Sequence, residues 1–353
     1  MSTSSPAPST GDDLVISGIG VVTPWADTPV AAAAATGRPS EPGDWFDHRE
    51  RLGRRGYKYL PTATQYFLAA AKHALADAGE TRPESDPEDE QRRGAMVGTN
   101  SAAVALHESM DHTVMAEGAN ALSPATAPYF SINLFGSRLA TEHVFRAFNL
   151  TLTSPRVAGL EALETGARSI AAGRASWLLA GATEEALPAG HPGADASERG
   201  AVALVMEPVA KVRERGTAGY GRCRVRSFFL PPEVAASPEG PDRVRERIAA
   251  VLAGQGMGPG QEHRVIAVLD DSPVSAAVAV AVGPRADLVT AGAGALEPLL
   301  QVAGALAELS GPVVVVTAAR EGNLAVALLT PPDDVVRPAR HDRGRRSTAC
   351  PTT

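Results

Sequence analysis

Short apolar runs alternate with longer amphipathic segments along most of the chain. The apolar runs predict buried strands at residues 14–22, 94–99, 150–153, 177–182, 200–207, 264–269, 287–290, 313–316 and 324–329. Residues 222–230 alternate in polarity and predict one further strand. Amphipathic segments predict helices at residues 28–35, 61–78, 101–116, 132–145, 243–253, 274–280 and 294–309, and another from Val157 onward. This alternation predicts an α/β fold with helices on both faces of its sheets, in which the runs at 177–182 and 200–207 are parallel strands.

The pattern of elements in the first part of the chain recurs in a shorter form in the second part. The residues themselves do not repeat, so an internal duplication is an interpretation of the pattern alone. We predict an N-terminal half at residues 13–215 and a shortened C-terminal half at residues 216–332. Residues 1–12 and the Arg-rich residues 333–353 are predicted to be disordered tails. For the second tail, a solvated segment is favoured over an arm that binds polyanions.

The composition is that of an ordinary globular protein, with 44% hydrophobic and 21% charged residues. A net charge of -7 argues against nonspecific binding to nucleic acid or to an anionic membrane. No apolar run reaches the ~18 residues of a membrane-spanning helix, and the N-terminus lacks the pattern of a secretion signal. We therefore expect a cytoplasmic protein with neither a nucleic-acid nor a membrane partner.

The sequence gives little support for a bound cofactor or metal. Cys223 and Cys350 form neither a disulfide framework nor a metal site. Residues 18–20 read Gly-Ile-Gly, but Thr23 stands where a dinucleotide-binding loop needs its third glycine. We expect no cofactor and no metal.

The most informative stretch is Asn149–Ala158, which reads N-L-T-L-T-S-P-R-V-A. It predicts a strand, a sharp turn at Ser154-Pro155 and a helix. Such a turn is a common seat for a nucleophile, because it lifts one side chain to the helix N-terminus. The lifted residue here is Arg156, and a guanidinium cannot be deprotonated to act as a nucleophile.

Several motifs resemble those of β-ketoacyl synthases, in matching order and spacing. They are L-V-I-S-G-I-G-V-V-T-P from residue 14, G-A-M-V-G-T-N from 94, L-S-P-A-T-A-P-Y-F-S-I-N from 122 and the stretch from Asn149 to Glu184. In the second half, A-G-A-G-A-L-E-P-L-L and E-G-N-L-A-V-A-L-L resemble the family less strongly. The resemblance implies a thiolase-like fold, with two related halves in a five-layer αβαβα arrangement that assembles as a dimer.

The resemblance also implies that the catalytic groups of the family are missing. Arg156 stands where the family has its Cys nucleophile. Val268–Pro273 and Ala286–Ala291 stand where its two His motifs are expected, and neither contains His. The closing Gly-rich loop of the family is reduced to Ala318–Asn323. Decarboxylative condensation needs a Cys thiolate and two His side chains. The resemblance therefore predicts a chain without catalytic residues, in which Arg156 occupies the nucleophile position.

Chain-length factors also lack these catalytic groups. They are the inactive halves of ketosynthase heterodimers in type II polyketide systems. They usually carry Gln at the Cys position, so Arg156 departs from them as well. The shortened second half looks most like the compact partners of highly reducing, polyene-forming systems. The resemblance implies two partners, an active ketosynthase and, through that complex, an acyl carrier protein.

The candidate interface and tunnel residues follow from this resemblance. Leu150, Thr151, Leu152 and Thr153 are assigned to an edge strand that pairs with the partner, as in ketosynthase dimers. Leu106, Met110 and Thr113 share one helix face and are candidates for the floor of the partner's tunnel, with plain core positions as the alternative. Phe130 and Phe135 flank that region and are more often core than tunnel residues. Arg156 either reaches a carboxylate or backbone carbonyls of the partner or of its own half, or fills the vacated acyl pocket as a hydrogen-bonded plug.

Two other functions remain open at this point. One is an acyltransferase or hydrolase that acts on acyl carrier protein thioesters through Ser154 or His112. The other is a homodimeric scaffold without a tunnel.

Overall fold

The computed structural model describes residues 14–35, 45–79, 91–124, 127–129 and 131–332. The two predicted tails and Phe130 lie outside these residues, as does most of the charged segment before the second strand. The ten predicted strands are all present. They are β1 Leu14–Val22, β2 Arg93–Gly98, β3 Phe148–Leu152, β4 Trp177–Glu184, β5 Gly200–Pro208, β6 Arg222–Phe229, β7 Arg264–Leu269, β8 Asp287–Thr290, β9 Val313–Ala318 and β10 Asn323–Thr330.

The strands form two five-stranded sheets with the same internal order. Sheet A has the order β1-β5-β4-β2-β3, and sheet B has the order β6-β10-β9-β7-β8. Strand for strand along the chain, the second order repeats the first. This agreement supports the duplication that the pattern of elements suggested. One prediction was wrong, because β5 runs antiparallel to both β4 and β1, whereas β4 and β2 are parallel.

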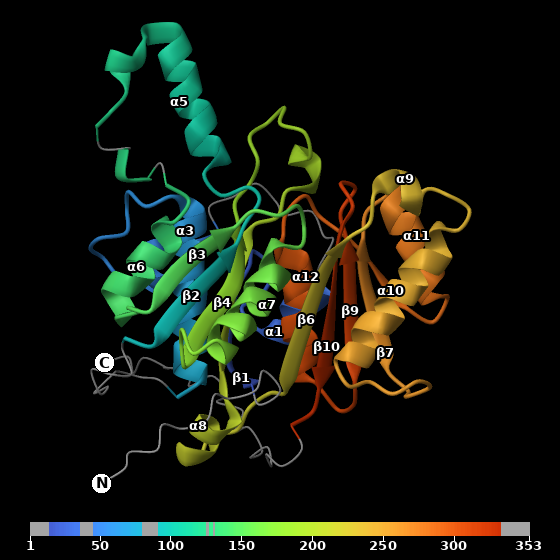
Figure 1. Cartoon of the computed structure of the whole chain (residues 1–353). Helices are drawn as coiled ribbons and strands as arrows, with labels where there is room; N and C mark the ends of the chain where they lie inside the picture. The colour runs from blue at the N-terminus through green and yellow to red at the C-terminus, as the bar shows by residue number, and fades with distance from the viewer. Residues whose placement is uncertain (1–13, 36–44, 80–90, 125–126, 130, 333–353) are drawn as a thin grey trace, which may run out of the picture.

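Helices form the other three layers. They are α1 Pro29–Ala34, α2 His48–Arg51, α3 Thr62–Asp77, α5 Val104–Glu117, α6 Leu134–His143, α7 Ala158–Ala171, α8 Val209–Glu214, α9 Pro232–Ala235, α10 Gly240–Gly254, α11 Pro273–Val282 and α12 Leu296–Ala307. Helices α7 and α12 lie between the sheets and contact strands of both (Figure 1). Helices α3 and α6 cover the outer face of sheet A, and α10 and α11 cover that of sheet B. The five-layer αβαβα arrangement of a thiolase-like fold is therefore confirmed.

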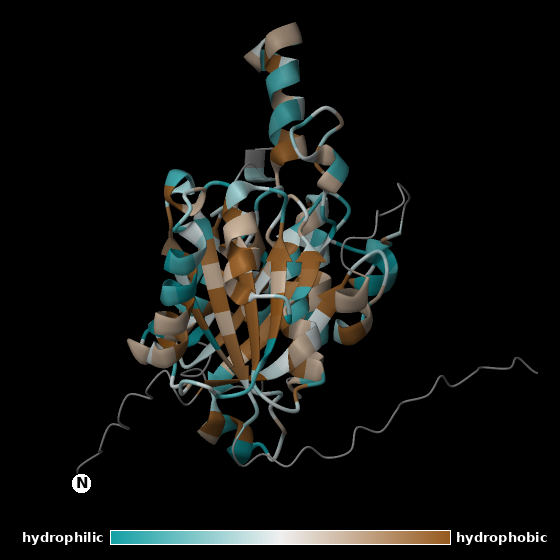
Figure 2. Ribbon diagram, turned by 90° about the vertical axis from the view of Figure 1, so that its right-hand side faces the viewer, coloured by the Kyte–Doolittle hydropathy of each residue, from teal (hydrophilic) through white to brown (hydrophobic). Residues whose placement is uncertain are grey.

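The core follows these layers. One apolar cluster fills the space between the sheets around Leu160 and Leu299, a second lies under α3 around Phe67, and a third lies under α10 around Val244. The brown strands in Figure 2 show the apolar character of the buried sheets. Each layer is built by the apolar runs and amphipathic faces that the sequence pattern predicts.

The Gly-Ile-Gly of β1 has a packing role. Helix α3 crosses β1 so closely that a Cβ on Gly20 would lie 1.9 Å from the carbonyl oxygen of Ala70. A Cβ on Gly18 would lie 2.2 Å from that of Ala74. Only glycine allows this approach, which explains the two glycines without a nucleotide.

Candidate functional site

The turn between β3 and α7 has the geometry of a nucleophile elbow. Arg156 adopts a positive φ of 58°, which is strained for a residue with a Cβ. Asn100 holds the turn through both ends of its amide. Its Nδ2 donates to the carbonyl oxygens of Thr153 and Ser154 at 3.0 and 3.2 Å, and its Oδ1 accepts from Arg156 N at 3.0 Å. Sequence reasoning missed Asn100, although a polar residue directly after β2 must lie at the same sheet edge as the elbow.

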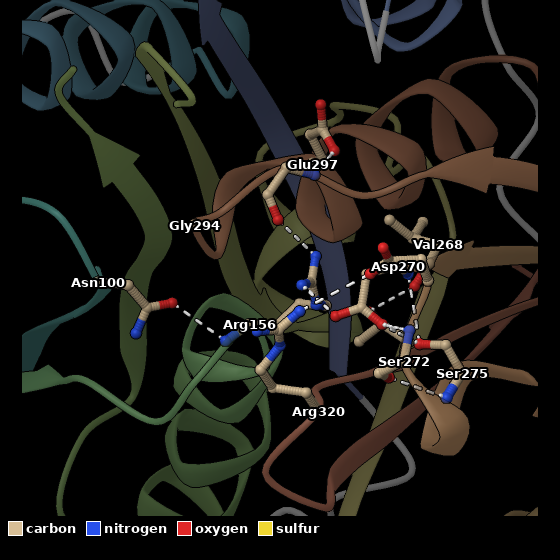
Figure 3. Close-up of polar contacts among 12 residues, drawn as sticks. Asn100, Arg156, Val268, Asp270, Ser272, Ser275, Gly294, Glu297 and Arg320 are labelled. Atoms are coloured by element: carbon tan, nitrogen blue, oxygen red, sulfur yellow. Dashed lines mark hydrogen bonds and ion pairs between the residues drawn. The ribbon is translucent and has the colours of Figure 1, made fainter. Parts of the chain in front are cut away.

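The side chain of Arg156 reaches from the first half into the second. Nη1 donates to the carbonyl oxygen of Gly292 at 2.6 Å, and Nη2 lies 3.0 Å from Asp270 Oδ2 (Figure 3). Both side chains are nearly buried, with 10% and 12% of their surfaces exposed. Both contacts lie within this chain and join its first half to its second.

Asp270 is fixed on its other side by the start of α11. Its Oδ1 accepts from Ser272 N at 3.0 Å and from Ser275 Oγ at 2.7 Å. Burial alone would raise the pKa of Asp270. The hydrogen bonds from Ser272 and Ser275 and the charge of Arg156 outweigh burial and lower this pKa, so the carboxylate stays ionised.

A pocket of about 810 Å³ lies beside Arg156 at the carboxyl ends of the strands of sheet B. Its lining includes Arg156 and part of each of the three segments that the resemblance assigns to an active site. These parts are residues 269–271 of Val268–Pro273, residues 290–291 of Ala286–Ala291 and residues 319–321 of Ala318–Asn323. Among the described residues that line it, none is Cys, His or Lys. The polar groups that line it are the Arg156–Asp270 ion pair, the charged side chains of Asp271, Arg320 and Glu321, the side chains of Asn100 and Thr290, and backbone groups.

Three buried glutamates lie beneath this pocket, and sequence reasoning missed them. Glu184, Glu198 and Glu297, which we call the carboxylate cluster, are 0%, 4% and 5% exposed. Burial raises the pKa of Glu184, and burial with repulsion from Glu297 and Glu184 raises that of Glu198 well above its usual range. Glu184 at the end of the apolar strand β4 was the available signal, because charged side chains are rarely buried without partners.

Leu106, Met110 and Thr113 lie on α5, which projects from the body of the molecule (Figure 1). No residue of α5 is buried, and Met115 is 87% exposed. The three predicted residues are only partly covered. They are therefore not core residues of this chain. Leu106 also lines a pocket of about 540 Å³ at the base of α5, together with Tyr59, Tyr129 and Glu185.

The other predicted interface residues separate into two groups. Strand β3 is an edge of sheet A, as predicted, but it is half-exposed rather than buried, and Leu150 is 40% exposed. Within it, Thr151 Oγ1 donates to the carbonyl oxygen of Ile132 at 3.1 Å. Phe135, by contrast, is 3% exposed and packs edge-to-face on Phe67 at 6.4 Å. Phe135 is therefore a core residue, and we remove it from the candidates for the interface.

The residues of the alternative enzyme do not line the Arg156 pocket, although Ser154 directly precedes Pro155, which does. Neither Ser154 nor His112 lines it, and His112 lies on α5 with its side chain 80% exposed, 3.9 Å from Glu108. The described residues contain no group of three or more His, Cys, Asp or Glu side chains that could hold a metal ion. They also contain no helix that is long and apolar enough to cross a membrane.

Comparisons with known proteins agree with this architecture. Residues 27–197 match the family model of the β-ketoacyl synthase N-terminal domain. A 3-oxoacyl-[acyl-carrier-protein] synthase 2 from Rhizobium meliloti is 30% identical over 141 residues, which cover 40% of this chain and 32% of the relative. The corresponding synthase of Vibrio cholerae is 27% identical over 154 residues, 43% of this chain and 36% of the relative. The matched segments thus span about a third of these curated relatives.

Solved structures extend the similarity to both halves. The AntDE:AntF complex, a type II PKS acyl-carrier protein with its ketosynthase bound to the hexaketide, gives a TM-score of 0.70 at 16% identity. The ishigamide ketosynthase/chain length factor gives 0.69 at 21% identity. Both comparisons cover 90% of this chain and 99% of the other. The chain therefore has the thiolase-like fold of ketosynthases, and its first half is similar in sequence to the N-terminal domain of β-ketoacyl synthases.

Proposed function

We propose that this chain is a non-catalytic subunit of the chain-length-factor type, which pairs with an active ketosynthase and limits the length of the polyketide chain. The observation that carries the proposal is Arg156. It occupies the elbow of a nucleophile and pairs with Asp270, in the segment Val268–Pro273 where the resemblance leads us to expect a His motif. A guanidinium held in this way can neither carry an acyl group nor accept a proton.

Two exposed elements support the need for a partner. Strand β3 leaves its outer edge without a neighbouring strand in the described residues, and an open edge favours pairing with another chain. Helix α5 has 14 residues and no buried side chain, whereas isolated helices of that length are only marginally stable in water. A partner that covers α5 and β3 together would stabilise both.

The partly covered face of α5 is the surface that we assign to the end of the partner's acyl tunnel. Leu106, Met110 and Thr113 lie on this face, and Leu106 continues into the pocket at the base of the helix. Apolar side chains at the end of a tunnel would stop a growing chain by excluded volume. The partner delivers the chain from an acyl carrier protein, as the components of the AntDE:AntF complex suggest.

Co-expression with an active ketosynthase, sought among the genes that neighbour the gene of this chain, tests the proposal. We expect the two to co-purify as a 1:1 complex. A chain that is soluble alone and does not bind the ketosynthase would refute the subunit assignment. A homodimer by light scattering, in the presence of the ketosynthase, would favour the scaffold alternative.

The tunnel assignment has its own test in the active complex. Replacing Leu106 or Met110 with Trp should shorten the product by at least one two-carbon unit, because the indole fills space at the tunnel end. Met115→Trp is the matched control, since Met115 lies on another face of α5 and is 87% exposed. Products of unchanged length from all variants would reject the assignment. An acyl adduct on this chain in intact-mass spectra would instead support an enzyme acting through Ser154 or His112.

A further inference from the structure

The segment Gly292–Glu297, which we call the amide loop, leads from β8 into α12. All six of its backbone N–H groups donate hydrogen bonds within the chain, and five of them go to the carboxylate cluster. Ala295 N donates to Glu184 at 2.7 Å, Gly294 N, Leu296 N and Glu297 N donate to Glu198 at 3.0, 2.7 and 3.3 Å, Gly292 N donates to Glu297, and Ala293 N donates to the carbonyl oxygen of Ala196 at 2.8 Å. The anion-binding end of α12 is thus filled by the chain's own carboxylates.

This arrangement concentrates carboxyl groups in a nearly dry region. Backbone hydrogen bonds favour the ionised carboxylates, but burial and mutual repulsion oppose them. For Glu198, the opposing effects are burial, Glu297 on α12 and Glu184 on β4, and together they raise its pKa. Asp270, which follows β7, is joined to the same loop through Arg156, so four carboxyl groups are bonded to the loop directly or through that side chain.

Arg156 is placed to balance these charges. Its guanidinium donates to the carbonyl oxygen of Gly292, the first residue of the amide loop, and pairs with Asp270. Its charge also opposes the rise in the pKa of Glu198. Arg320 is the other cation among the described residues that line the pocket. Its side chain is 66% exposed and lies 3.7 Å from Asp271, so water screens it.

We propose that Arg156 is the counter-charge of a buried assembly formed by Asp270 and the carboxylate cluster, and that it positions the amide loop. Arg156 is then more than a plug for a vacated pocket. The substitution Arg156→Cys would remove the counter-charge and destabilise the amide loop. The role concerns stability and shape, and it does not depend on the identity of the partner.

Thermal unfolding of the full chain between pH 5 and pH 8 tests the proposal. Carboxyl groups with a raised pKa cost stability as the pH rises above about 4.5, because the unfolded chain ionises first. Arg156→Met raises the pKa of Glu198 further and extends this loss to higher pH. We expect the Tm of R156M to fall below that of the wild type at both pH values, with a gap about 3 °C wider at pH 8. R156K, which keeps the charge, should narrow the gap.

Two further variants separate this role from simple packing. Arg320→Met removes a cation from the same pocket and should shift the Tm by about 1 °C or less at either pH. The double variant R156M/E198Q should show a smaller pH-dependent gap than R156M. A gap of equal size at both pH values, or one that R320M reproduces, would overturn the proposal.

Glu198→Gln keeps the proposal testable if R156M fails to fold. In this variant the NH₂ group of Gln faces a backbone N–H donor, which should lower the Tm at every pH. The informative quantity is therefore the change in Tm between pH 5 and pH 8. E198Q should lose less Tm over this range than the wild type, because one titrating group is gone. A profile parallel to that of the wild type would contradict the assignment.

Discussion

The exposure of α5 leads to a prediction about hydrogen exchange. In the monomeric chain, the backbone amides of residues 104–117 should exchange far faster than those of α7, which also has 14 residues. Because we propose that a ketosynthase covers α5, we expect its addition to slow the exchange of this helix. The two helices are a matched pair in length and differ in burial, because nine residues of α7 are buried and none of α5.

The size of the difference follows from what holds each helix. An isolated helix of this length opens at a cost of about 0–1 kcal/mol, so its amides should be protected less than about tenfold. Helix α7 lies between the sheets and opens only with the domain, at roughly 5 kcal/mol or more. Since about 1.4 kcal/mol is a factor of ten, its protection should exceed roughly 10³.

Peptide-level exchange measured by mass spectrometry can resolve this difference. The chain is labelled alone, with its monomeric state checked by light scattering, and again in complex with the ketosynthase. Protection of α5 equal to that of α7 in the monomer would refute the reasoning from burial. Unchanged exchange of α5 in a stable complex would show that the partner binds another surface.

Two further predictions concern packing and reactivity. Gly20→Ala should lower the free energy of unfolding by about 3 kcal/mol, because the added Cβ would lie 1.9 Å from the carbonyl oxygen of Ala70. Gly311→Ala, whose added Cβ has no atom within 4 Å, should change it by less than about 0.5 kcal/mol, and equal urea midpoints for the two variants would contradict this prediction. Burial raises the pKa of the Cys223 thiol to about 12. Alkylation of this thiol by iodoacetamide at pH 8 should therefore be roughly 10³-fold slower in the folded chain than in urea. Similar rates in the two states would show that the thiol is not buried.

The strands were the most predictable part of the fold. β1, β7 and β8 have the predicted bounds, because apolar runs that end at polar residues or proline leave few alternatives for where a buried strand stops. The direction of β5 was not predictable in this way, since an apolar run buried on both faces looks the same in either orientation. Direction depends on the connection and on the neighbouring strands.

The site was predictable only in part. The resemblance placed Arg156 together with Val268–Pro273, Ala286–Ala291 and Ala318–Asn323, and the pocket is lined by Arg156 and part of each segment. The carboxylate cluster could not be predicted from the sequence, because its burial depends on hydrogen bonds from amide groups that are far away along the chain. The N–H of Ala295, for example, donates to the carboxyl group of Glu184. The face of α5 was visible in the pattern, but the pattern does not say whether a face packs on the same chain or on another.

The ion pair of Arg156 also has a mechanical consequence. Arg156 belongs to the half that contains sheet A, while Asp270 and Gly292 belong to the half that contains sheet B. The contact therefore acts as a joint across the interior of the molecule, in addition to the Glu164 carboxylate, which accepts from Ser227 N at 2.9 Å and from Arg226 Nη1 at 3.1 Å. Relative movement of the halves would have to break nearly buried charged contacts. In the proposed complex, a subunit joined in this way would present a stiff wall to the tunnel of the ketosynthase, whose dimensions would then stay constant from one turnover to the next.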